Sequence, residues 1–474
     1  MPLILGPDRD TCPSGDRLRS LIIAFRVTQI SETPAAERSN RWLAALWAAG
    51  AGLRLAFIFL EPQTRPIADE TMWLMALNRI PAADFSPFSN YPIFHPPLYS
   101  YFLAAINALF GSLTAIKVIQ AIISSLLIPA VFRIALRVSG PGTALGAASL
   151  AAFYPEFVWY SAHFWCETLF LALVWWAIER LIAADQGEIR RSAVAAGVLF
   201  GLAVLTRETL LYLLPLAALW LAAPKPRRVA PAAALLLSAL AVVAPWTLRN
   251  WIQFESFIPV STGGGLNLYQ GNAPISRNEV YSEYYANEGK VEQYQWARSA
   301  GLKVIWERQP AWIFEKIRDE GPRLAELDSL ALIHMRRGAY GEVSCAAYRG
   351  AALIVLLPWI VIAVGSVVAL SRARIDRRSG LIMGFLCAYL LLHIATHGFS
   401  RYRMPVLPAF MILSATLLAP LPSVRPSSGR RAVLVTLALA VSFLWAPSLL
   451  DQLGHLGLAA PPGHEGFAPI CPVR

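Results

Sequence analysis

Long apolar runs recur along the whole chain, and they constrain its fold more than any other feature. A helix needs roughly 17–25 apolar residues to cross about 30 Å of hydrocarbon, and we identify about eleven such runs. They lie at 42–60, 113–134, 141–163, 168–184, 192–207, 209–223, 229–247, 347–370, 380–397, 404–421 and 432–449. Hydrophobic residues make up 56% of the 474 and charged residues only 15%. This composition excludes an ordinary soluble enzyme and a disordered chain, and it predicts an all-α polytopic membrane protein.

Basic residues gather in short patches between these runs. The patches are Arg133/Arg137, Arg190-Arg191, Lys225/Arg227-Arg228, Arg372/Arg374/Arg377-Arg378 and Arg425/Arg430-Arg431. Loops of this kind mark the cytoplasmic side of a membrane protein. Threading the runs on that basis places the N-terminus in the cytoplasm and the C-terminus outside. The net charge of +11 therefore belongs to membrane loops, and we expect membrane lipids and no nucleic acid as partners.

The runs divide the chain into five parts. Residues 1–41 are expected to be a cytoplasmic segment, 42–247 a transmembrane module with an outer loop at 61–112, and 248–346 an outer segment. Residues 347–450 return to the membrane and 451–474 form an outer tail. An apolar stretch at 98–110 is too short to span and predicts an interfacial helix. Helical periodicity continues over 290–335.

Two further features receive plain interpretations. Thr262-Gly263-Gly264-Gly265 lacks the Lys-Ser/Thr of a phosphate-binding P-loop and follows no strand, so we interpret it as a turn. The five cysteines show no CxxC pair and no metal-ligand spacing. We interpret them as small apolar residues.

Three carboxylates lie at the expected outer ends of spans, where charge is costly. Asp69 and Glu70 follow the first run. Because adjacent carboxylates repel and the interface desolvates them, one should have a raised pKa that suits a general base. They could equally solvate a helix end. Glu167 ends the third run, with His163 one turn earlier on the same helix face. That pair could hold a divalent metal, although two ligands are too few for a complete site, or it could form a simple hydrogen bond.

Four arginines also lie at outer ends, against the charge bias of the loops. They are Arg207, Arg249, Arg401 and Arg403. Guanidinium groups pair with phosphate oxygens in bidentate fashion, which predicts a phospholipid-linked substrate. Each of them alone could instead snorkel to lipid headgroups.

The remaining ionisable groups within or beside spans are given local roles. Glu208 adjoins Arg207, so we expect an ion pair between them. Arg54, inside the first run, should pair within the bundle or snorkel. His393 and His397 share helical spacing and are expected to form a packed or pore-lining pair.

An ordered set of short motifs resembles a known family. The motifs are Asp69-Glu70, Pro96–Tyr99, Glu167, Thr206-Arg207, Pro245–Asn250 and Arg401–Pro405. Together they resemble the GT-C glycosyltransferases, in the branch similar to lipid A aminoarabinose transferases and dolichyl-phosphate-mannose protein O-mannosyltransferases. The resemblance extends over residues 42–450. It implies a GT-C-like bundle with interfacial helices and a periplasmic segment.

The resemblance also implies an activity: inverting transfer of a sugar from a polyprenyl-phosphate donor to a lipid, glycan or protein acceptor. The active site would face the periplasm from the bacterial inner membrane. By this analogy Asp69 deprotonates the acceptor, while Glu70 and Glu167 position acceptor or sugar. The arginines and His163 would bind the substrate. His95 stands where some relatives carry a Lys, and it could donate to phosphate more weakly and in a pH-dependent way.

Two other functions are compatible with this pattern. A flippase or transporter of lipid-linked oligosaccharide would carry ionisable groups deep inside several spans, whereas most of those here collect at one face. An O-antigen ligase or polymerase would also use outer arginines on a lipid carrier. The acidic pair after the first span favours the GT-C transferase over that alternative.

Overall fold

The computed structural model describes residues 34–61, 65–79, 93–187, 189–223, 228–372, 376–419, 444–458 and 470–471. Within these ranges the chain forms helices and their connections and no strand, which confirms the all-α prediction. The expected cytoplasmic segment 1–41 and the expected span 432–449 lie largely outside the described residues.

Five described helices are long and apolar enough to cross a membrane. They are Glu37–Leu60, Leu113–Ser139, Val229–Phe254, Cys345–Arg372 and Arg377–Ala395. This confirms a multi-pass membrane protein. The expected count of about eleven spans is not confirmed, partly because predicted runs divide into shorter helices. The run 141–163, for example, becomes α7 (Pro141–Phe153) and α8 (Pro155–Ser161).

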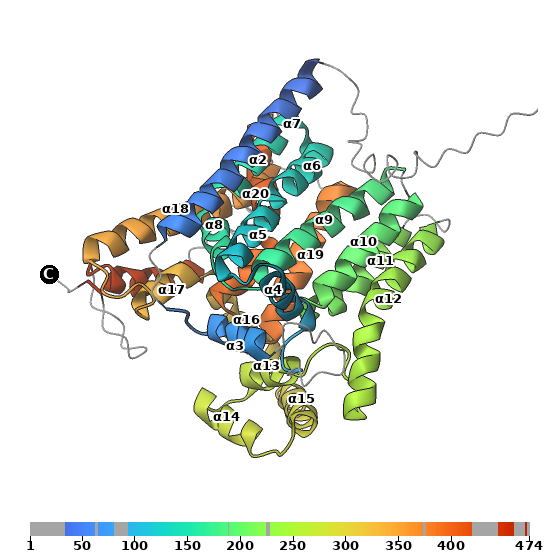
Figure 1. The fold of residues 1–474 in the computed structure, drawn as a ribbon, viewed down its shortest axis with the longest axis vertical. Coiled ribbons are helices and arrows are strands. Elements are labelled where there is room, and N and C mark those ends of the chain that lie inside the picture. The colour runs from blue at the N-terminus through green and yellow to red at the C-terminus, as the bar shows by residue number, and fades with distance from the viewer. Residues whose placement is uncertain are drawn as a thin grey trace, which may run out of the picture.

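The helices of the bundle come from the parts of the chain before and after the outer segment (Figure 1). They are α2 (Pro34–Leu60), α5 (Leu113–Ser125), α6 (Leu127–Ser139), α7, α8, α9 (Glu167–Asp185), α10 (Ile189–Val204), η2 (Glu208–Leu213), α11 (Leu214–Ala222), α12 (Val229–Phe254), α18 (Cys345–Arg372), α19 (Arg377–Ala395), η4 (Ser400–Val406), α20 (Leu407–Ala415) and η5 (Thr416–Leu418). Small residues allow close contact, as on α10, where a Cβ added to Gly197 would lie 2.2 Å from the Leu235 carbonyl of α12. Such close approach of backbones is typical of helix packing in membranes.

Arg54 lies inside α2 and is fully buried. Its guanidinium donates to the Ser124 hydroxyl at 2.9 Å and to the Gly50 carbonyl at 2.9 Å. It also donates to the carbonyls of Ala151 and Ala152 at 3.0 and 2.8 Å, at the C-terminus of α7. The last carbonyls of a helix have no partner inside it. Arg54 therefore pairs within the bundle and caps α7 where the chain breaks before α8.

Several of the basic patches expected to face the cytoplasm meet at one end of the bundle. Arg133 binds Glu179 at 2.8 Å, and Arg377 binds Asp185 at 3.1 Å. Arg228, from a third patch, also pairs with Asp185. We call this the basic end. Since Asp185 is the last residue of α9, the first residue of α9 marks the opposite end, which we call the site end.

The expected outer segment is helical throughout most of its length and lies at the site end. It contains α13 (Gly263–Asn272), α14 (Arg277–Tyr285), α15 (Lys290–Glu307), α16 (Ala311–Ala325) and α17 (Leu330–Arg336). The first three form a layer along the lower edge of Figure 1, below α3 (Asp69–Arg79). The periodicity over 290–335 is thereby confirmed. The interpretation of Thr262–Gly265 as a plain turn is wrong, because these residues begin α13.

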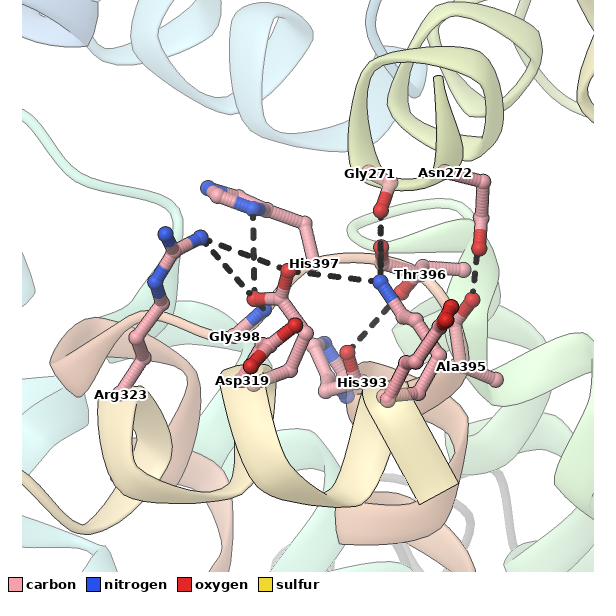
Figure 2. A network of polar contacts seen from close by, with 12 residues as sticks. Gly271, Asn272, Asp319, Arg323, His393, Ala395, Thr396, His397 and Gly398 are labelled. Carbon is pink, nitrogen blue, oxygen red and sulfur yellow. Dashed lines mark hydrogen bonds and ion pairs between the residues drawn. The ribbon is translucent and has the colours of Figure 1, made fainter. Parts of the chain in front are cut away.

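A polar cluster holds the outer segment against the C-terminal end of α19 (Figure 2). Lys316 of α16 donates to the Gly271 carbonyl at 2.6 Å and the Thr396 carbonyl at 3.1 Å. Glu320, one turn further along α16, accepts from the Gly398 amide at 2.7 Å. A Cβ at Gly271 would lie 1.6 Å from the Thr396 oxygen, so the approach of α13 requires glycine there. These contacts fix the segment that leads directly into η4.

Two cysteines form a disulfide. Cys345, at the start of α18, is bonded to Cys471 of the C-terminal tail. The interpretation of all five cysteines as plain apolar residues is therefore wrong for this pair. Cys166 is buried and Cys387 exposed, and both are free. The spacing of Cys345 and Cys471 in the chain carries no sign of their pairing, because the disulfide joins segments 126 residues apart.

The short apolar stretch at 98–110 forms α4 (Pro97–Phe110), close to its expected bounds. Ser112 then caps the next helix by accepting a hydrogen bond from the Ala115 amide at 3.4 Å. With 14 residues, α4 is too short to cross the hydrocarbon.

Candidate active site

Four charged side chains from four segments form a continuous chain of ion pairs at the site end. Asp69 Oδ2 lies 2.6 Å from Arg401 Nη1, and Arg401 Nε lies 3.7 Å from Glu167 Oε1. The same Glu167 oxygen lies 2.7 Å from Arg207 Nη1. One carboxylate oxygen thus serves both arginines. We call these four residues the ion-pair chain.

Each member of the ion-pair chain is placed at the end of a helix or in a short 3₁₀ segment. Asp69 and Glu167 are the first residues of α3 and α9, where the helix dipole favours a negative charge. Arg207 precedes η2, and Arg401 lies in η4. Ala68, just before Asp69, has a φ of 55°. A left-handed alanine is strained, and such strain persists where the surroundings hold a functional residue in place.

Aromatic rings enclose the two guanidinium groups. Arg401 lies over the Trp165 ring at 5.0 Å and the Tyr402 ring at 5.2 Å. Arg207 lies over the same Tyr402 ring at 5.3 Å and over Phe170 at 5.8 Å. Cation–π contacts of this kind stabilise a guanidinium that has lost water. The rings therefore orient both guanidinium groups, and the guanidinium N–H groups can donate to anions.

Asp69 does not have the raised pKa that its adjacency to Glu70 predicts. Burial acts to raise the pKa of the Asp69 carboxyl, but the ion pair with Arg401 outweighs burial and leaves that pKa below its ordinary value. His95 and Arg207 act in the same direction. The sequence argument failed because it counted the neighbouring carboxylate and could not foresee the arginine brought by η4. Asp69 is thus an ionised carboxylate at neutral pH.

Glu70 is fully buried and turns away from Asp69. Its Oε1 accepts a hydrogen bond from the Phe164 amide at 3.1 Å. Its Oε2 lies 3.4 Å from the Ile67 amide and 3.9 Å from His334 Nδ1. The two adjacent carboxylates therefore face different partners, as expected when consecutive residues open a helix.

His95 lies beside Asp69 on a segment that α13 holds in place. The Thr262 amide donates to the Ile93 carbonyl at 2.7 Å. The His95 ring packs against Trp73 at 4.7 Å, and its Nε2 is buried without a hydrogen-bond partner. Burial lowers the pKa of His95 to about 4. The ring is therefore neutral near pH 7 and keeps one N–H donor, so its donation to a phosphate stays a prediction.

His163 does not pair with Glu167. The chain leaves α8 at Ser161 and begins α9 only at Glu167, so the two residues do not share a helix face. His163 Nε2 instead lies 2.8 Å from Glu61 Oε1, and its Nδ1 lies 2.7 Å from the Trp159 carbonyl. The prediction assumed one continuous helix across this break. Among the residues that the structure describes, no group of three or more His, Cys, Asp or Glu side chains could hold a metal ion.

Arg249 and Arg403 are buried but are not members of the ion-pair chain. Arg249 lies on α12 against the rings of Trp246 and Phe254, at 4.8 and 5.2 Å. Arg403 donates to the carbonyls of Glu326 and Asp328, both at 2.6 Å. The structure therefore brings together two of the four expected arginines. The other two pack α12 and hold the loop before α17.

Glu208 is not paired with Arg207, because Arg207 binds Glu167 instead. Its carboxylate accepts from the Ser261 hydroxyl at 2.7 Å. Burial raises the pKa of Glu208 to about 7. A Cβ at Gly264 would lie 2.2 Å from Glu208 Oε1, which explains a glycine at the start of α13. Glu208 thus links the segment that carries Arg207 to the outer segment.

The two histidines expected to form a pair are both packed, but not against each other. His393 is buried between the rings of Tyr389 and Tyr402, at 4.4 and 4.8 Å. His397 Nδ1 lies 3.7 Å from Glu320 Oε2, in the polar cluster of Figure 2.

Sequence analysis did not single out five residues that line this region. Trp165 and Tyr402 lie inside the motifs around Glu167 and Arg401, so proximity in the chain could have indicated them. Glu61 follows the first span directly and binds the Tyr340 hydroxyl at 2.8 Å. Tyr340 and His334 carry no signal in the sequence, since only the fold brings α17 to the site.

An apolar pocket of about 290 Å³ lies within the bundle. It is lined by residues of α9, α10, η2, α11 and α19. Leu210 of η2 lines it three residues after Arg207, and Ala388 of α19 lines it beside Tyr389. The pocket reaches Trp220 and Leu381 toward the basic end. Its lining is apolar throughout, so it favours hydrocarbon over water.

Comparison with protein families gives a match over about a third of this chain. Residues 94–248 match the family described as dolichyl-phosphate-mannose-protein mannosyltransferase. The match confirms the resemblance to GT-C glycosyltransferases. It includes His95, Glu167 and Arg207, whereas Asp69 and Arg401 lie outside it. A comparison with curated proteins gives no match.

Solved structures with a similar arrangement include archaeal and bacterial enzymes. The Archaeoglobus fulgidus oligosaccharyltransferase tethered to an acceptor peptide is 13% identical, with a TM-score of 0.49, over 90% of this chain and 56% of that one. The same organism's AglB in complex with an inhibitory peptide and a dolichol-phosphate is 15% identical, with a TM-score of 0.46, over 89% and 56%. ArnT from Cupriavidus metallidurans bound to undecaprenyl phosphate is 15% identical, with a TM-score of 0.41, over 79% and 77%. The chain spans a little over half the length of the oligosaccharyltransferase chains that it matches.

Proposed function

We propose that this chain is an integral membrane glycosyltransferase that moves a sugar from a polyprenyl-phosphate donor to an acceptor hydroxyl. The observation that carries the proposal is the ion-pair chain together with an apolar pocket whose lining includes Leu210, three residues after Arg207. Two guanidinium groups beside a hydrocarbon-lined space match the two halves of a lipid phosphate. The family match over 94–248 supports the same class of enzyme.

The donor phosphate binds Arg207 and Arg401, and its isoprenoid chain enters the pocket. The ion-pair chain carries two positive and two negative groups, so an incoming phosphodiester competes with Glu167 and Asp69 for the guanidinium N–H groups. Arg401 Nε lacks a close hydrogen-bond partner in the described structure, which leaves it available to a phosphate oxygen. Glu167, held between both arginines, keeps them oriented.

In the transfer step the acceptor oxygen attacks the anomeric carbon of the donor sugar. The bond from that carbon to the phosphate oxygen breaks, and the electron pair leaves with the lipid phosphate. Asp69 takes the proton of the acceptor hydroxyl as general base. The arginines stabilise the negative charge that develops on the leaving phosphate. A single displacement from the face opposite the phosphate inverts the anomeric centre.

The position of Arg401 couples donor binding to base strength. Its ion pair keeps the pKa of Asp69 low, and a low pKa makes a carboxylate a weak base. When the donor phosphate draws Arg401 away, that pKa rises toward its ordinary value. Asp69 therefore gains basicity when the donor is in place.

We infer that the site faces the periplasm from the bacterial inner membrane. The basic end gathers the arginine patches that favour the cytoplasmic side. The Cys345–Cys471 disulfide joins the residues that follow α17 to the C-terminal tail. Disulfides persist in oxidising compartments, which supports placing these residues outside the cytoplasm.

The proposal is tested by mass spectrometry of surface glycans and glycolipids from a deletion strain. The strain is complemented with the wild-type protein or with Asp69→Asn, at matched membrane levels. We expect a sugar to be missing in the deletion strain and restored only by the wild type. Full restoration by Asp69→Asn would contradict the role of the carboxylate. A lipid-linked oligosaccharide that accumulates on the cytoplasmic face would favour a flippase instead.

A further inference from the structure

We propose that His334 and Glu70 form the part of the site that recognises the donor sugar. The inference rests on the proposed function and extends it from the lipid phosphate to the glycosyl unit. It starts from an unusual side chain on α17. His334 is fully buried, and neither of its ring nitrogens has a hydrogen-bond partner among the described residues.

Leaving both nitrogens of a buried imidazole unpaired is unfavourable. Burial of an unsatisfied donor or acceptor costs roughly 1–3 kcal/mol, and most buried polar groups in proteins have a partner. A phenylalanine of similar shape would avoid this cost among the aromatic rings that surround His334. The presence of histidine here is explained if a ligand completes its hydrogen bonds.

The surroundings of His334 connect it directly to the ion-pair chain. Its Nδ1 lies 3.9 Å from Glu70 Oε2. Its ring meets Trp159 edge-on at 4.9 Å and Trp165 at 5.9 Å. Trp165 is the ring over which Arg401 lies. The imidazole and the guanidinium proposed to bind phosphate therefore share one aromatic neighbour.

The loop and turns around α17 are held firmly. Arg336 forms an ion pair with Asp328, and Arg65 donates to the Arg337 carbonyl at 3.1 Å. The Tyr340 hydroxyl donates to Glu61, as described above. These contacts anchor α17 on both sides of His334, so the imidazole is presented by a fixed support rather than by a loose loop.

The chemistry of the group suits an uncharged, hydroxyl-bearing ligand. Burial lowers the pKa of His334 to about 3, so the ring is neutral and offers one donor and one acceptor. With the proton on Nδ1, that N–H lies 3.9 Å from Glu70 Oε2, beyond hydrogen-bond distance, and Nε2 is left to accept from a sugar hydroxyl. The Glu70 carboxylate accepts from a second hydroxyl. A negative carboxylate beside a neutral imidazole repels phosphate, which separates this part of the site from Arg207 and Arg401.

The test compares binding of lipids with and without a sugar. The full chain in nanodiscs is titrated with undecaprenyl phosphate and with its mannosyl, glucosyl and aminoarabinosyl derivatives. We expect at least one sugar to raise the affinity of the wild type. His334→Phe should lower the affinity for that glycosylated lipid about tenfold, the loss of one hydrogen bond, and change binding of the bare lipid less than about twofold. His334→Gln should retain part of the difference.

Control variants separate recognition from packing. His334→Phe should melt no lower than the wild type, because it removes an unsatisfied buried group. His455→Phe is the matched control, since His455 lies in the C-terminal segment against Asp451 and should leave both affinities unchanged. Equal binding of glycosylated lipid by wild type and His334→Phe would overturn the inference. So would a parallel loss for both lipids, or a wild type that gains affinity from none of the three sugars. A wild type that does not bind undecaprenyl phosphate at all would instead contradict the proposed function.

Discussion

Replacing Arg401 by glutamine tests the proposed phosphate site most directly. Arg401 bridges Asp69 and Glu167, and its side chain is only 16% exposed. Its loss changes the charge of the ion-pair chain from zero to minus one, so the site repels an anion that it previously attracted. A hydrogen bond to a charged group contributes about 1.5–3 kcal/mol. We therefore expect affinity for undecaprenyl phosphate to fall about 10- to 150-fold.

Stability should change less than it does for a fully buried ion pair. Removing one partner of such a pair typically costs about 3–5 kcal/mol. The Asp69 side chain is 34% exposed, so water can replace part of the lost interaction. The Arg401→Gln protein should accordingly fold, with a moderately lowered melting temperature.

The assay is titration of the purified protein in nanodiscs with undecaprenyl phosphate, followed by intrinsic tryptophan fluorescence, to which Trp165 beside Arg401 contributes. Arg403→Gln is the matched control, because Arg403 lies two residues away in η4 but donates to backbone carbonyls and lies over the Trp359 ring, outside the ion-pair chain. It should melt at a lower temperature yet bind the lipid phosphate like the wild type. If Arg401→Gln binds within twofold of the wild type while Arg403→Gln loses affinity, the assignment of the phosphate site is wrong.

Three further predictions follow from the same contacts. Asp69→Asn should reduce turnover by about 100-fold or more, as for loss of a general base. Its affinity for lipid phosphate should be equal or higher, because Asp69 no longer competes with the phosphate for Arg401. Turnover and affinity are measured on one preparation. The raised pKa of Glu208 means that the folded state binds the Glu208 proton more tightly than the unfolded state does, so stability should fall as pH rises from about 5 through about 7. Glu208→Gln should flatten the dependence of melting temperature on pH in this range, measured by scanning fluorimetry. An unchanged slope in the variant would contradict the prediction. Replacing Cys345 and Cys471 together by serine should lower the melting temperature, since disulfides typically contribute about 2–5 kcal/mol, and added reductant should then have no further effect.

The sequence predicts where the site lies better than it predicts which side chains form ion pairs with one another. Position relative to the apolar runs identified Asp69, Glu167, Arg207 and Arg401, because charge at the end of a span is costly and needs a reason. Nothing in the spacing of these residues encodes that a single Glu167 oxygen contacts both arginines. That contact depends on how α9, η2 and η4 pack, which is a property of the whole bundle.

His163 shows how a local error propagates. Sequence analysis ended one apolar run at 163 and began the next at 168, but it treated the first helix as continuing to Glu167. Helical spacing then places His163 above Glu167. The break at 162–166 instead sends His163 to Glu61, which sequence analysis had not considered. Composition identifies membrane-spanning character well, but it does not detect at which residue a helix ends.

The motif Arg401-Tyr402-Arg403 also shows that local backbone conformation decides which contacts a side chain makes. Two arginines separated by one residue would share a side in an extended strand. In η4, a 3₁₀ helix with about three residues per turn, they diverge by about 120°. Arg401 therefore enters the ion-pair chain, whereas Arg403 holds the carbonyls of Glu326 and Asp328. Those carbonyls precede α17, the helix that presents His334 to Glu70. On our proposal the two arginines serve one site in different ways: the first binds the donor phosphate, and the second fixes the loop that positions the sugar-binding histidine.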